Sequence, residues 1–340
     1  MSKVVTFGEI MVRLNPEGYL RFRQADRFEV SYAGGEANVA VSLANFGMDA
    51  KFVTKLPDND IGQSAIDSIR KYGVDVSNII IGGRRVGLYY VEKGASQRAS
   101  KVIYDREFSS IACASRSDFN WNSIFENTKW FHFTGITPAL GGELPDICLD
   151  ACKAAKSRGI TVSCDLNYRS KLWSKEKAGQ VMSSLMPYVD VCIANESDAS
   201  DVFGINAAHT NVEAGELDYN AYENVAKQLK EKFDLKACAI TLRGSISASE
   251  NNWAGMLFDG RSAYFSKTYS IKIVDRVGGG DSFSAALIYS LYNGYGAQDA
   301  IEFATAASCL KQTIEHDFNI LSVQEVQALV SGKGSGRVQR

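Results

Sequence analysis

The stretch DRVGGGDSFSAALIYSL, residues 275–291, is the most informative part of this chain. Its three consecutive glycines, Gly278, Gly279 and Gly280, carry no Cβ, so their N–H groups can turn toward an anion at close range. Apolar residues then recur at helical spacing as far as Gly294, which predicts that the glycines begin a helix. Unpaired N–H groups and the helix dipole favour negative charge at such an end.

Asp281 follows the glycines at the same predicted helix end. A carboxylate is common there as a helix cap, which is the structural interpretation. Beside an anion-binding loop, a carboxylate can also accept the proton of a hydroxyl group that attacks a phosphorus atom. The rest of the chain decides between these two interpretations.

Length, composition and charge restrict the class of protein. The chain has 340 residues, of which 45% are hydrophobic and 22% charged, as in soluble globular proteins. The net charge of −2 gives no electrostatic footprint for nucleic acid or an anionic membrane. No apolar stretch reaches the roughly 18 residues of a spanning helix. Residues 1–7 run directly into a strand pattern with no n-region, h-region or cleavage site, so we expect no leader peptide. We therefore expect no nucleic-acid or membrane partner.

Seven cysteines and three histidines bear on compartment and metal binding. Most cysteines stand inside apolar strand or helix patterns, as Cys192 and Cys238 do, which is typical of buried, reduced thiols in a cytoplasmic enzyme. The histidines are widely separated, and nothing near Cys148 and Cys152 completes a metal site. We expect no metal held directly by the protein.

Strand and helix patterns alternate along most of the chain. This alternation predicts an α/β fold, with a mostly parallel sheet covered by helices on both faces, as one domain over residues 1–340. The predicted strands are 4–7, 51–53, 130–133, 160–164, 189–194 and 237–242, and the predicted helices are 36–46, 61–72, 147–157, 175–186 and 219–232.

Two segments, residues 11–33 and 84–108, interrupt this rhythm. Both are rich in Arg, Tyr and Phe at near-alternating positions, without helical periodicity. We interpret them as insertions that form one small separate sheet. Such a sheet is marginal alone, so it should cover the active edge as a lid or pack against a second subunit. A homo-oligomer, such as a dimer through the lid sheet, is expected.

Several polar groups stand where predicted elements begin or end. Gly34, Gly35 and Asn38 open the first helix, either as an ordinary turn or as a place where a polyol meets the backbone. Asn167 and Arg169 follow the strand at 160–164, at the sheet edge where ligands of α/β proteins bind.

Two further strand ends carry groups suited to a nucleotide. Asn195 follows the strand at 189–194, where it either caps a helix or helps to order water around a nucleotide-borne magnesium ion. Arg243 and Gly244 follow the next strand, either as a turn or as a guanidinium placed against phosphates.

Taken together, GGEANVA at 34–40 and DRVGGGD at 275–281 resemble the two signatures of the PfkB/ribokinase family of carbohydrate kinases. Their order, their separation and the interrupting lid segments also match, so the resemblance covers essentially the whole chain. It implies a ribokinase-like three-layer α/β/α sandwich with a small β-sheet lid. It also implies ATP as phosphoryl donor and Mg²⁺ carried by the nucleotide, and it leaves a monovalent-cation requirement open.

Within the family, the likeness is greatest to 2-keto-3-deoxygluconate kinases, on the segments 133–140, 165–169 and 310–314. This likeness implies that Tyr89, Tyr104, Arg106 and Arg169 line a sugar-acid pocket. Arginine's planar fork binds a carboxylate bidentately, whereas a neutral sugar would give two pocket arginines nothing to pair with. Some positions depart from the family pattern: Arg276 replaces the usual threonine, Gly279 the usual alanine and Asp198 a common glutamate.

The sequence thus predicts phosphorylation of a primary hydroxyl on a sugar acid, with 2-keto-3-deoxygluconate as the substrate. The predicted site comprises Asp281, Gly278, Gly279 and Gly280 for catalysis; Gly34, Gly35, Asn38, Tyr89, Tyr104, Arg106, Asn167, Arg169 and Asp281 for the sugar acid; and Asn195, Arg243, Gly244, Gly278 and Gly280 for ATP.

Other functions remain as alternatives. A kinase of the same family could act on 2-keto-3-deoxygalactonate, or on a neutral sugar as fructokinases and ribokinases do. A dinucleotide-dependent oxidoreductase needs a Gly-x-Gly-x-x-Gly turn after an early strand, and this chain has only Gly8 there. A non-catalytic sugar-binding protein would have no need of the base Asp281.

Overall fold

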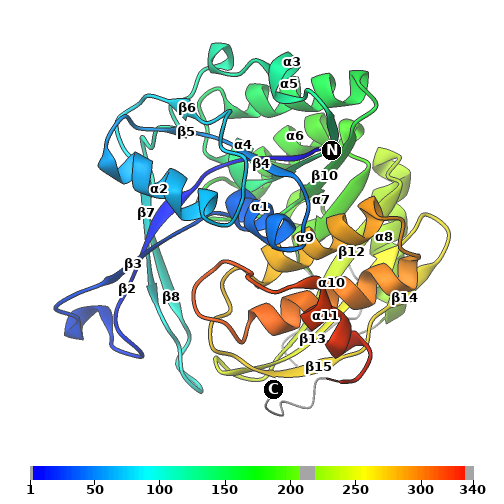
Figure 1. Cartoon of the computed structure of the whole chain (residues 1–340). Helices are drawn as coiled ribbons and strands as arrows, with labels where there is room; N and C mark the ends of the chain where they lie inside the picture. The colour runs from blue at the N-terminus through cyan, green and yellow to red at the C-terminus, as the bar shows by residue number, and fades with distance from the viewer. Residues whose placement is uncertain (1–2, 196, 207–218, 334–340) are drawn as a thin grey trace.

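The computed structural model describes residues 3–195, 197–206 and 219–333. A nine-stranded sheet forms the centre, with the strand order β14-β13-β12-β11-β10-β9-β1-β4 and β15 paired to β13 (Figure 1). Its strands are β1 (Lys3–Phe7), β4 (Ala50–Val53), β9 (Thr128–Thr134), β10 (Thr161–Asp165), β11 (Val191–Ala194), β12 (Ala237–Ser245), β13 (Glu250–Phe258), β14 (Ala263–Phe265) and β15 (Tyr269–Lys272).

Six neighbouring strands of the central sheet are parallel, as the alternating pattern predicts: β4, β1, β9, β10, β11 and β12. Their carboxyl ends therefore meet at one edge of the sheet, which becomes the edge that carries the site. The strands β13, β14 and β15 add an antiparallel end that the sequence pattern did not predict. Strand β12 also continues three residues beyond the predicted end at residue 242, because Ser245 still pairs with Asn251 of β13.

Helices cover both faces of this sheet, because neighbouring strand residues point to opposite faces and most of them are apolar. Phe131 of β9 packs in the core beneath α5, α6 and α8, whereas the adjacent Trp130 packs with α1, α9, α10 and α11. The helices are α1 (Gly35–Asn45), α2 (Asp60–Arg70), α3 (Trp121–Ile124), α4 (Ile136–Ala139), α5 (Leu144–Ser157), α6 (Lys175–Leu185), α7 (Asp198–Phe203), α8 (Tyr219–Phe233), α9 (Gly279–Tyr292), α10 (Ala297–Lys311) and α11 (Val323–Val330).

A second, four-stranded sheet has the order β3-β2-β7-β8 and projects from the main body in Figure 1. Its strands are β2 (Met11–Asn15), β3 (Glu29–Ala33), β7 (Gly87–Glu92) and β8 (Lys101–Asp105), all within the two interrupting segments. A short pair, β5 (Lys55–Leu56) and β6 (Ile80–Ile81), lies between them in the sequence. The three-layer sandwich with a small separate sheet is confirmed.

Candidate active site

Two cavities meet at the carboxyl edge of the parallel strands. The first, the inner cavity, lies under the second sheet and is lined by Gly34, Gly35, Tyr89 and Arg106, among others. The second, the outer cavity, extends along the ends of β10, β11 and β12 and is lined by Asn195, Arg243 and Gly280, among others. Asp281, Tyr104, Asn167, Val277 and Arg169 line both cavities, so they mark the junction.

Asp281 stands in the first turn of α9, half-buried at this junction. Burial raises the pKa of its carboxyl group from 3.8 to about 6. A hydrogen bond from Asn38 opposes this rise, Asp317 adds to it, and the positive charges of Arg169 and Lys311 also oppose it. The carboxylate therefore ionises near neutral pH, which suits a general base.

Asn38 lines the inner cavity, and its side chain also bonds to Asp281. Its Nδ2 donates to Asp281 Oδ2 at 2.6 Å, and its Oδ1 accepts the N–H of Gly34 at 3.3 Å. Gly34 is the N-cap of α1, and a Cβ there would lie 1.8 Å from the Glu9 carbonyl oxygen. A Cβ on Gly35 would lie 3.6 Å from Asp281 Oδ1. The turn at the start of α1 thus orients the Asp281 carboxylate.

The triple glycine forms the start of α9, as predicted. Gly278 has φ 82°, and a Cβ on it would lie 2.1 Å from the carbonyl oxygen of Asp317. The N–H of Gly279 is turned back to the carbonyl of Arg276 at 3.3 Å. Gly280 is exposed to the outer cavity with open space around its Cα. The N–H groups of Gly280 and Asp281 belong to the first turn, where the helix has no carbonyl to accept them.

Two tyrosines from the second sheet form one wall of the inner cavity. Tyr89 of β7 and Tyr104 of β8 stack with ring centroids 6.1 Å apart and an interplanar angle of 22°. The hydroxyl of Tyr89 donates to Asp317 Oδ2 at 2.9 Å, which fixes the ring. The second sheet therefore supplies an aromatic wall of the cavity that Asp281 also lines.

Arg106 lies in the inner cavity but is paired with a carboxylate of the protein itself. Its Nε donates to Glu9 Oε2 at 2.8 Å, and its Nη2 bonds to the same oxygen. Ser109 Oγ donates to the other Glu9 oxygen at 2.6 Å. Both members of the ion pair are buried. No motif pointed to Glu9, which follows β1 after a single glycine.

Arg169 presents its charge to the junction without a carboxylate partner among the described residues. Its hydrogen bond runs from Nη1 to the carbonyl of Tyr168 at 3.1 Å. The loop that carries it leaves β10 through Asn167, which adopts φ 40°, a value that residues other than glycine seldom take. Asn167 Nδ2 reaches back to Asp165 Oδ2 at 3.4 Å. This turn places Arg169 at the junction of the two cavities.

Acidic and amide groups line the outer cavity beside Arg169. Burial raises the pKa of Asp165, and the nearby Asp198 and Asp281 raise it further. Asp198 accepts the N–H groups of Tyr168 and Asn195 at 3.0 and 2.9 Å. Asn195 Oδ1 accepts the N–H of Asp198, which is the capping role weighed as its alternative. Glu196, in the same motif, lies outside the described residues.

Two arginines face the far part of the outer cavity. Arg243 lies in β12, where it pairs antiparallel with Trp253 of β13, and Arg276 precedes the glycine loop. Burial lowers the pKa of Arg276, and the charge of Arg243 lowers it further. The Nε of Arg276 is buried and has no hydrogen-bond partner among the described residues. Two like charges held together in a cavity predict an anionic ligand, and Arg276 was not among the predicted site residues.

Gly244 pairs with Asn252 inside the β12–β13 ladder and is not among the residues that line either cavity. The N–H of Gly279 is likewise engaged within the protein. Neither of these two glycines is therefore among the residues that line the cavities.

A buried ionic cluster includes Asp275, the residue at the start of the segment that leads into the glycine loop. Arg13 of β2 donates to Asp275 Oδ2 at 2.6 Å and to Asp317 Oδ1 at 2.5 Å. Burial disfavours the charge of Arg13, yet the two carboxylates raise its pKa above the ordinary value. Lys311, fully buried at the end of α10, completes the cluster. Sequence patterns did not single out Arg13 or Lys311, because such pairings join residues far apart in the chain.

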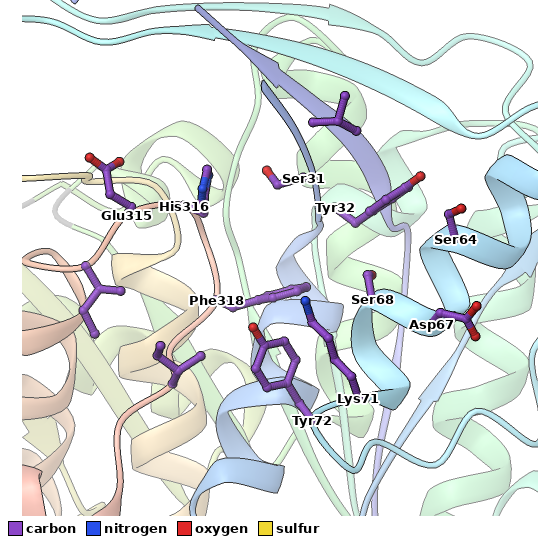
Figure 2. A pocket seen from close by; sticks show the side chains of 13 residues that line it. Ser31, Tyr32, Ser64, Asp67, Ser68, Lys71, Tyr72, Glu315, His316 and Phe318 are labelled. Carbon is purple, nitrogen blue, oxygen red and sulfur yellow. The ribbon is translucent and has the colours of Figure 1, made fainter. Parts of the chain in front are cut away.

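A third cavity, of about 610 Å³, lies away from this site between β3, α2 and the loop 314–320 (Figure 2). In this view Glu315, His316 and Phe318 approach from the loop, Ser64 and Ser68 from α2, and Lys71 from the residue that caps the end of α2. Phe318 packs edge-on against Tyr72. None of the predicted site residues lines this cavity.

The described residues contain no cluster of three or more metal-ligating side chains. Within the same ranges, no helix is both long and apolar enough to cross a bilayer.

Similar proteins are known in several organisms. A 2-dehydro-3-deoxygluconokinase from Thermotoga maritima has a crystal structure that superposes with a TM-score of 0.94 at 52% identity, over 98% of this chain and 100% of that chain. A 2-dehydro-3-deoxygalactonokinase from Haloferax volcanii is 33% identical over 98% of each chain. A 2-dehydro-3-deoxygluconokinase from Bacillus subtilis is 26% identical over 94% of this chain and 93% of its own length.

The family model described as pfkB family carbohydrate kinase matches residues 1–315. It therefore spans both glycine signatures, the second sheet and nearly every residue placed at the two cavities. The predicted resemblance is confirmed, and the chain belongs to the pfkB family of carbohydrate kinases.

Proposed function

We propose that the protein transfers the γ-phosphoryl group of ATP to the terminal hydroxyl of 2-keto-3-deoxygluconate, giving 2-keto-3-deoxy-6-phosphogluconate. The observation that carries the proposal is the position of Asp281, which lines both the inner and the outer cavity. A base at that junction can touch a sugar hydroxyl on one side while a nucleotide lies on the other. The gluconokinase relatives support this choice of substrate.

In this mechanism, Asp281 accepts the hydroxyl proton as the oxygen attacks the γ-phosphorus in line. Asn38 holds the carboxylate in place through its 2.6 Å hydrogen bond. The N–H groups of Gly280 and Asp281, together with the helix dipole, stabilise charge on the transferred phosphoryl oxygens. One preorganised donor of this kind is typically worth about 3 to 4 kcal/mol of barrier.

The acid group of the substrate is proposed to bind Arg169. Of the two arginines predicted for this role, Arg106 already has its charge compensated by Glu9, whereas Arg169 points its guanidinium toward the junction. A bidentate pair with a carboxylate would orient the far end of the substrate, and such binding energy aligns the reacting hydroxyl. Arg106 would then shape the pocket through its contact with Tyr104, because its guanidinium carbon lies over the Tyr104 ring, 5.3 Å from the ring centroid.

On the nucleotide side, Arg243 and Arg276 are proposed to contact the phosphates. Magnesium is proposed to arrive with ATP, held mainly by phosphate oxygens and water. The acidic surroundings fit this ion, because the mutual repulsion that raises the pKa of Asp165 would be relieved by a nearby divalent cation. Asp165, with Asn195 beside it, would contact waters on the metal.

2-Keto-3-deoxygalactonate is a second candidate substrate, favoured by the Haloferax relative at 33% identity. A coupled ADP-release assay over both keto acids, fructose, ribose and nucleosides tests the proposal. We expect turnover with a 2-keto-3-deoxy sugar acid, and the ratio of kcat/KM for the two epimers assigns the preferred one. Turnover of neutral sugars alone would contradict the role given to Arg169.

We also propose that the second sheet closes over the inner cavity as a lid within a single kinase domain, and that the protein is a cytoplasmic homodimer. Val30 of β3 and Ile103 of β8 are exposed on this sheet, so a second subunit could cover apolar surface there. Light scattering after size exclusion tests the assembly. A monomer at micromolar concentration contradicts it.

A further inference from the structure

Lys311 is a buried cationic residue beside the glycine loop. Its side chain is fully buried at the end of α10. The ammonium group donates to the carbonyl oxygens of Asp275 at 3.3 Å and His316 at 2.5 Å, and also to that of Val277. Asp275 and Val277 belong to the segment that runs directly into Gly278, so the ammonium holds the entry to the anion-binding turn.

The ammonium group of Lys311 has as many N–H donors as there are carbonyl oxygens around it. An ammonium group has three N–H donors and no acceptor, and three main-chain carbonyls converge on it. Convergent backbone carbonyls are also the ligand set with which proteins replace the hydration shell of a potassium ion. The polypeptide has therefore built a cage suited to a monovalent cation and filled it with one of its own side chains.

The surroundings supply the charge balance that a buried cation requires. Burial lowers the pKa of Lys311, while the carboxylates of Asp275 and Asp317 act in the opposite direction. The same carboxylates bind Arg13, so two cations and two anions share one buried cluster. His316, which presents the third carbonyl, has φ 62°, a conformation that its surroundings must hold in place.

We infer that Lys311 is a positioning residue that replaces a dissociable monovalent cation, so that the wild-type enzyme needs no potassium, sodium or ammonium for turnover. The inference rests on the proposed kinase function and deepens it. The tethered ammonium holds residues 275–277 and the loop at 316 together, and thereby fixes where the first turn of α9 presents its N–H groups. Its positive charge also lowers the pKa of the catalytic carboxylate, Asp281.

The test compares turnover in a buffer whose only monovalent cation is tetramethylammonium, which is too large for the cage, with the same buffer plus potassium or ammonium chloride. Wild-type kcat should change less than about twofold. Lys311→Ala should lose at least about tenfold in the tetramethylammonium buffer, since small misplacements of a loop at the reacting centre are costly. Potassium or ammonium should restore several-fold of this loss by entering the vacated cage.

A second readout does not depend on activity. Potassium should raise the Tm of Lys311→Ala in a concentration-dependent way but leave that of the wild type unchanged, because only the variant has a site to fill. Lys311→Met keeps the bulk of the stem, so it should lose activity without rescue. Lys267→Ala is the matched control, because Lys267 donates to a single exposed carbonyl, that of Val330, far from the site.

Potassium activation of the wild type by fivefold or more would overturn the inference, and this measurement holds even where the Lys311 variants fail to fold. A folded Lys311→Ala variant whose activity and Tm ignore potassium and ammonium would overturn it as well. Failure of the wild type to phosphorylate any sugar acid would instead reject the proposed function, while the Tm comparison would still report on the cage.

Discussion

Asn38 Nδ2 lies 2.6 Å from Asp281 Oδ2, although the two residues are 243 positions apart in the chain. The contact joins the first turn of α1 to the first turn of α9, and thus the two glycine signatures. Because an amide donor stabilises the ionised carboxylate, the contact lowers the pKa that burial raises. The first signature therefore tunes the carboxylate in the second that we propose as the base.

The pKa of about 6 for Asp281 predicts the pH dependence of catalysis. The base must be ionised, so kcat/KM should fall with a slope of one as the pH drops below about 6 and stay level from about pH 7 to 8. A kcat/KM profile from about pH 4.5 to 8.5 with a pH-independent coupling system measures this limb. A limb near pH 4 would contradict the effect ascribed to burial.

Removing the amide should move this limb. In Asn38→Ala, the carboxylate loses a hydrogen bond that favours its charge, so the midpoint should rise by about one pH unit. Turnover at pH 6.5 should then fall more than turnover at pH 8.5. Asn45→Ala is the matched control on the same helix, since Asn45 Nδ2 only donates to main-chain carbonyls, among them that of Val41. An unshifted limb in Asn38→Ala would reject the tuning role.

Asp281→Asn should separate catalysis from stability. Turnover should fall by about a thousandfold, while ATP and sugar-acid affinities change little, because only proton transfer is lost. The pKa of the folded carboxyl, about 6, lies above its ordinary 3.8, so keeping it ionised costs stability above pH 6 and nothing below pH 4. The neutral amide of the variant removes that cost.

The free energy of unfolding of Asp281→Asn should therefore exceed that of the wild type by about 1 to 2 kcal/mol at pH 7.5 and converge with it near pH 4. Urea unfolding at the two pH values measures the difference. Near wild-type turnover in this variant would rule out Asp281 as the base.

Much of this architecture is predictable from local sequence. Apolar runs such as 130–133 and 160–164 specify buried parallel strands, and the glycines at 278–280 specify a helix start. The antiparallel end was not predicted, because β13 begins with polar residues, among them Asn251 and Asn252, and follows β12 without an intervening helix, which breaks the strand–helix alternation. The second sheet was predictable because Arg and Tyr stand at near-alternating positions in its segments. Such a two-residue period indicates a strand even where the alternating residues are polar.

Pairings between distant residues were not predictable. The motif at 34–40 and the family likeness name Asn38 and Arg106 as substrate contacts, and the structure shows in addition that they bond to carboxylates of the protein, Asp281 and Glu9. The buried partners of Arg13 come from two separate loops. A local sequence pattern shows which side chains are charged but not which distant residues neutralise them. The structure was therefore needed to show which charges already have a partner within the protein.

The Glu9–Arg106 pair can be tested for a structural role. Arg106→Met leaves a buried carboxylate without its partner and should cost about 3 to 5 kcal/mol of unfolding free energy. The double variant Glu9→Gln, Arg106→Met removes both charges and should recover most of this loss. Urea unfolding of the two variants measures the recovery. A stability loss below about 1 kcal/mol in the single variant would show that the pair is not a structural element.

Arg169 should determine the preference for an acid over a neutral sugar. A hydrogen bond to a charged group contributes about 1.5 to 3 kcal/mol, so Arg169→Met should lower kcat/KM for the sugar acid about 10- to 150-fold. The same change should leave kcat/KM for a neutral analogue, in which the acid is reduced to an alcohol, within about threefold, because that group gives the guanidinium no charge to pair with.

Arg85→Met serves as the control for Arg169→Met, because Arg85 pairs with Asp105 on the surface of the second sheet and lines neither cavity. It should leave both substrates unaffected. Equal losses for acid and alcohol in Arg169→Met would mean that Arg169 holds the loop after β10 rather than the substrate. Selective loss of the acid would assign the charge of Arg169 to the ligand, because the charge of Arg106 is already compensated by Glu9.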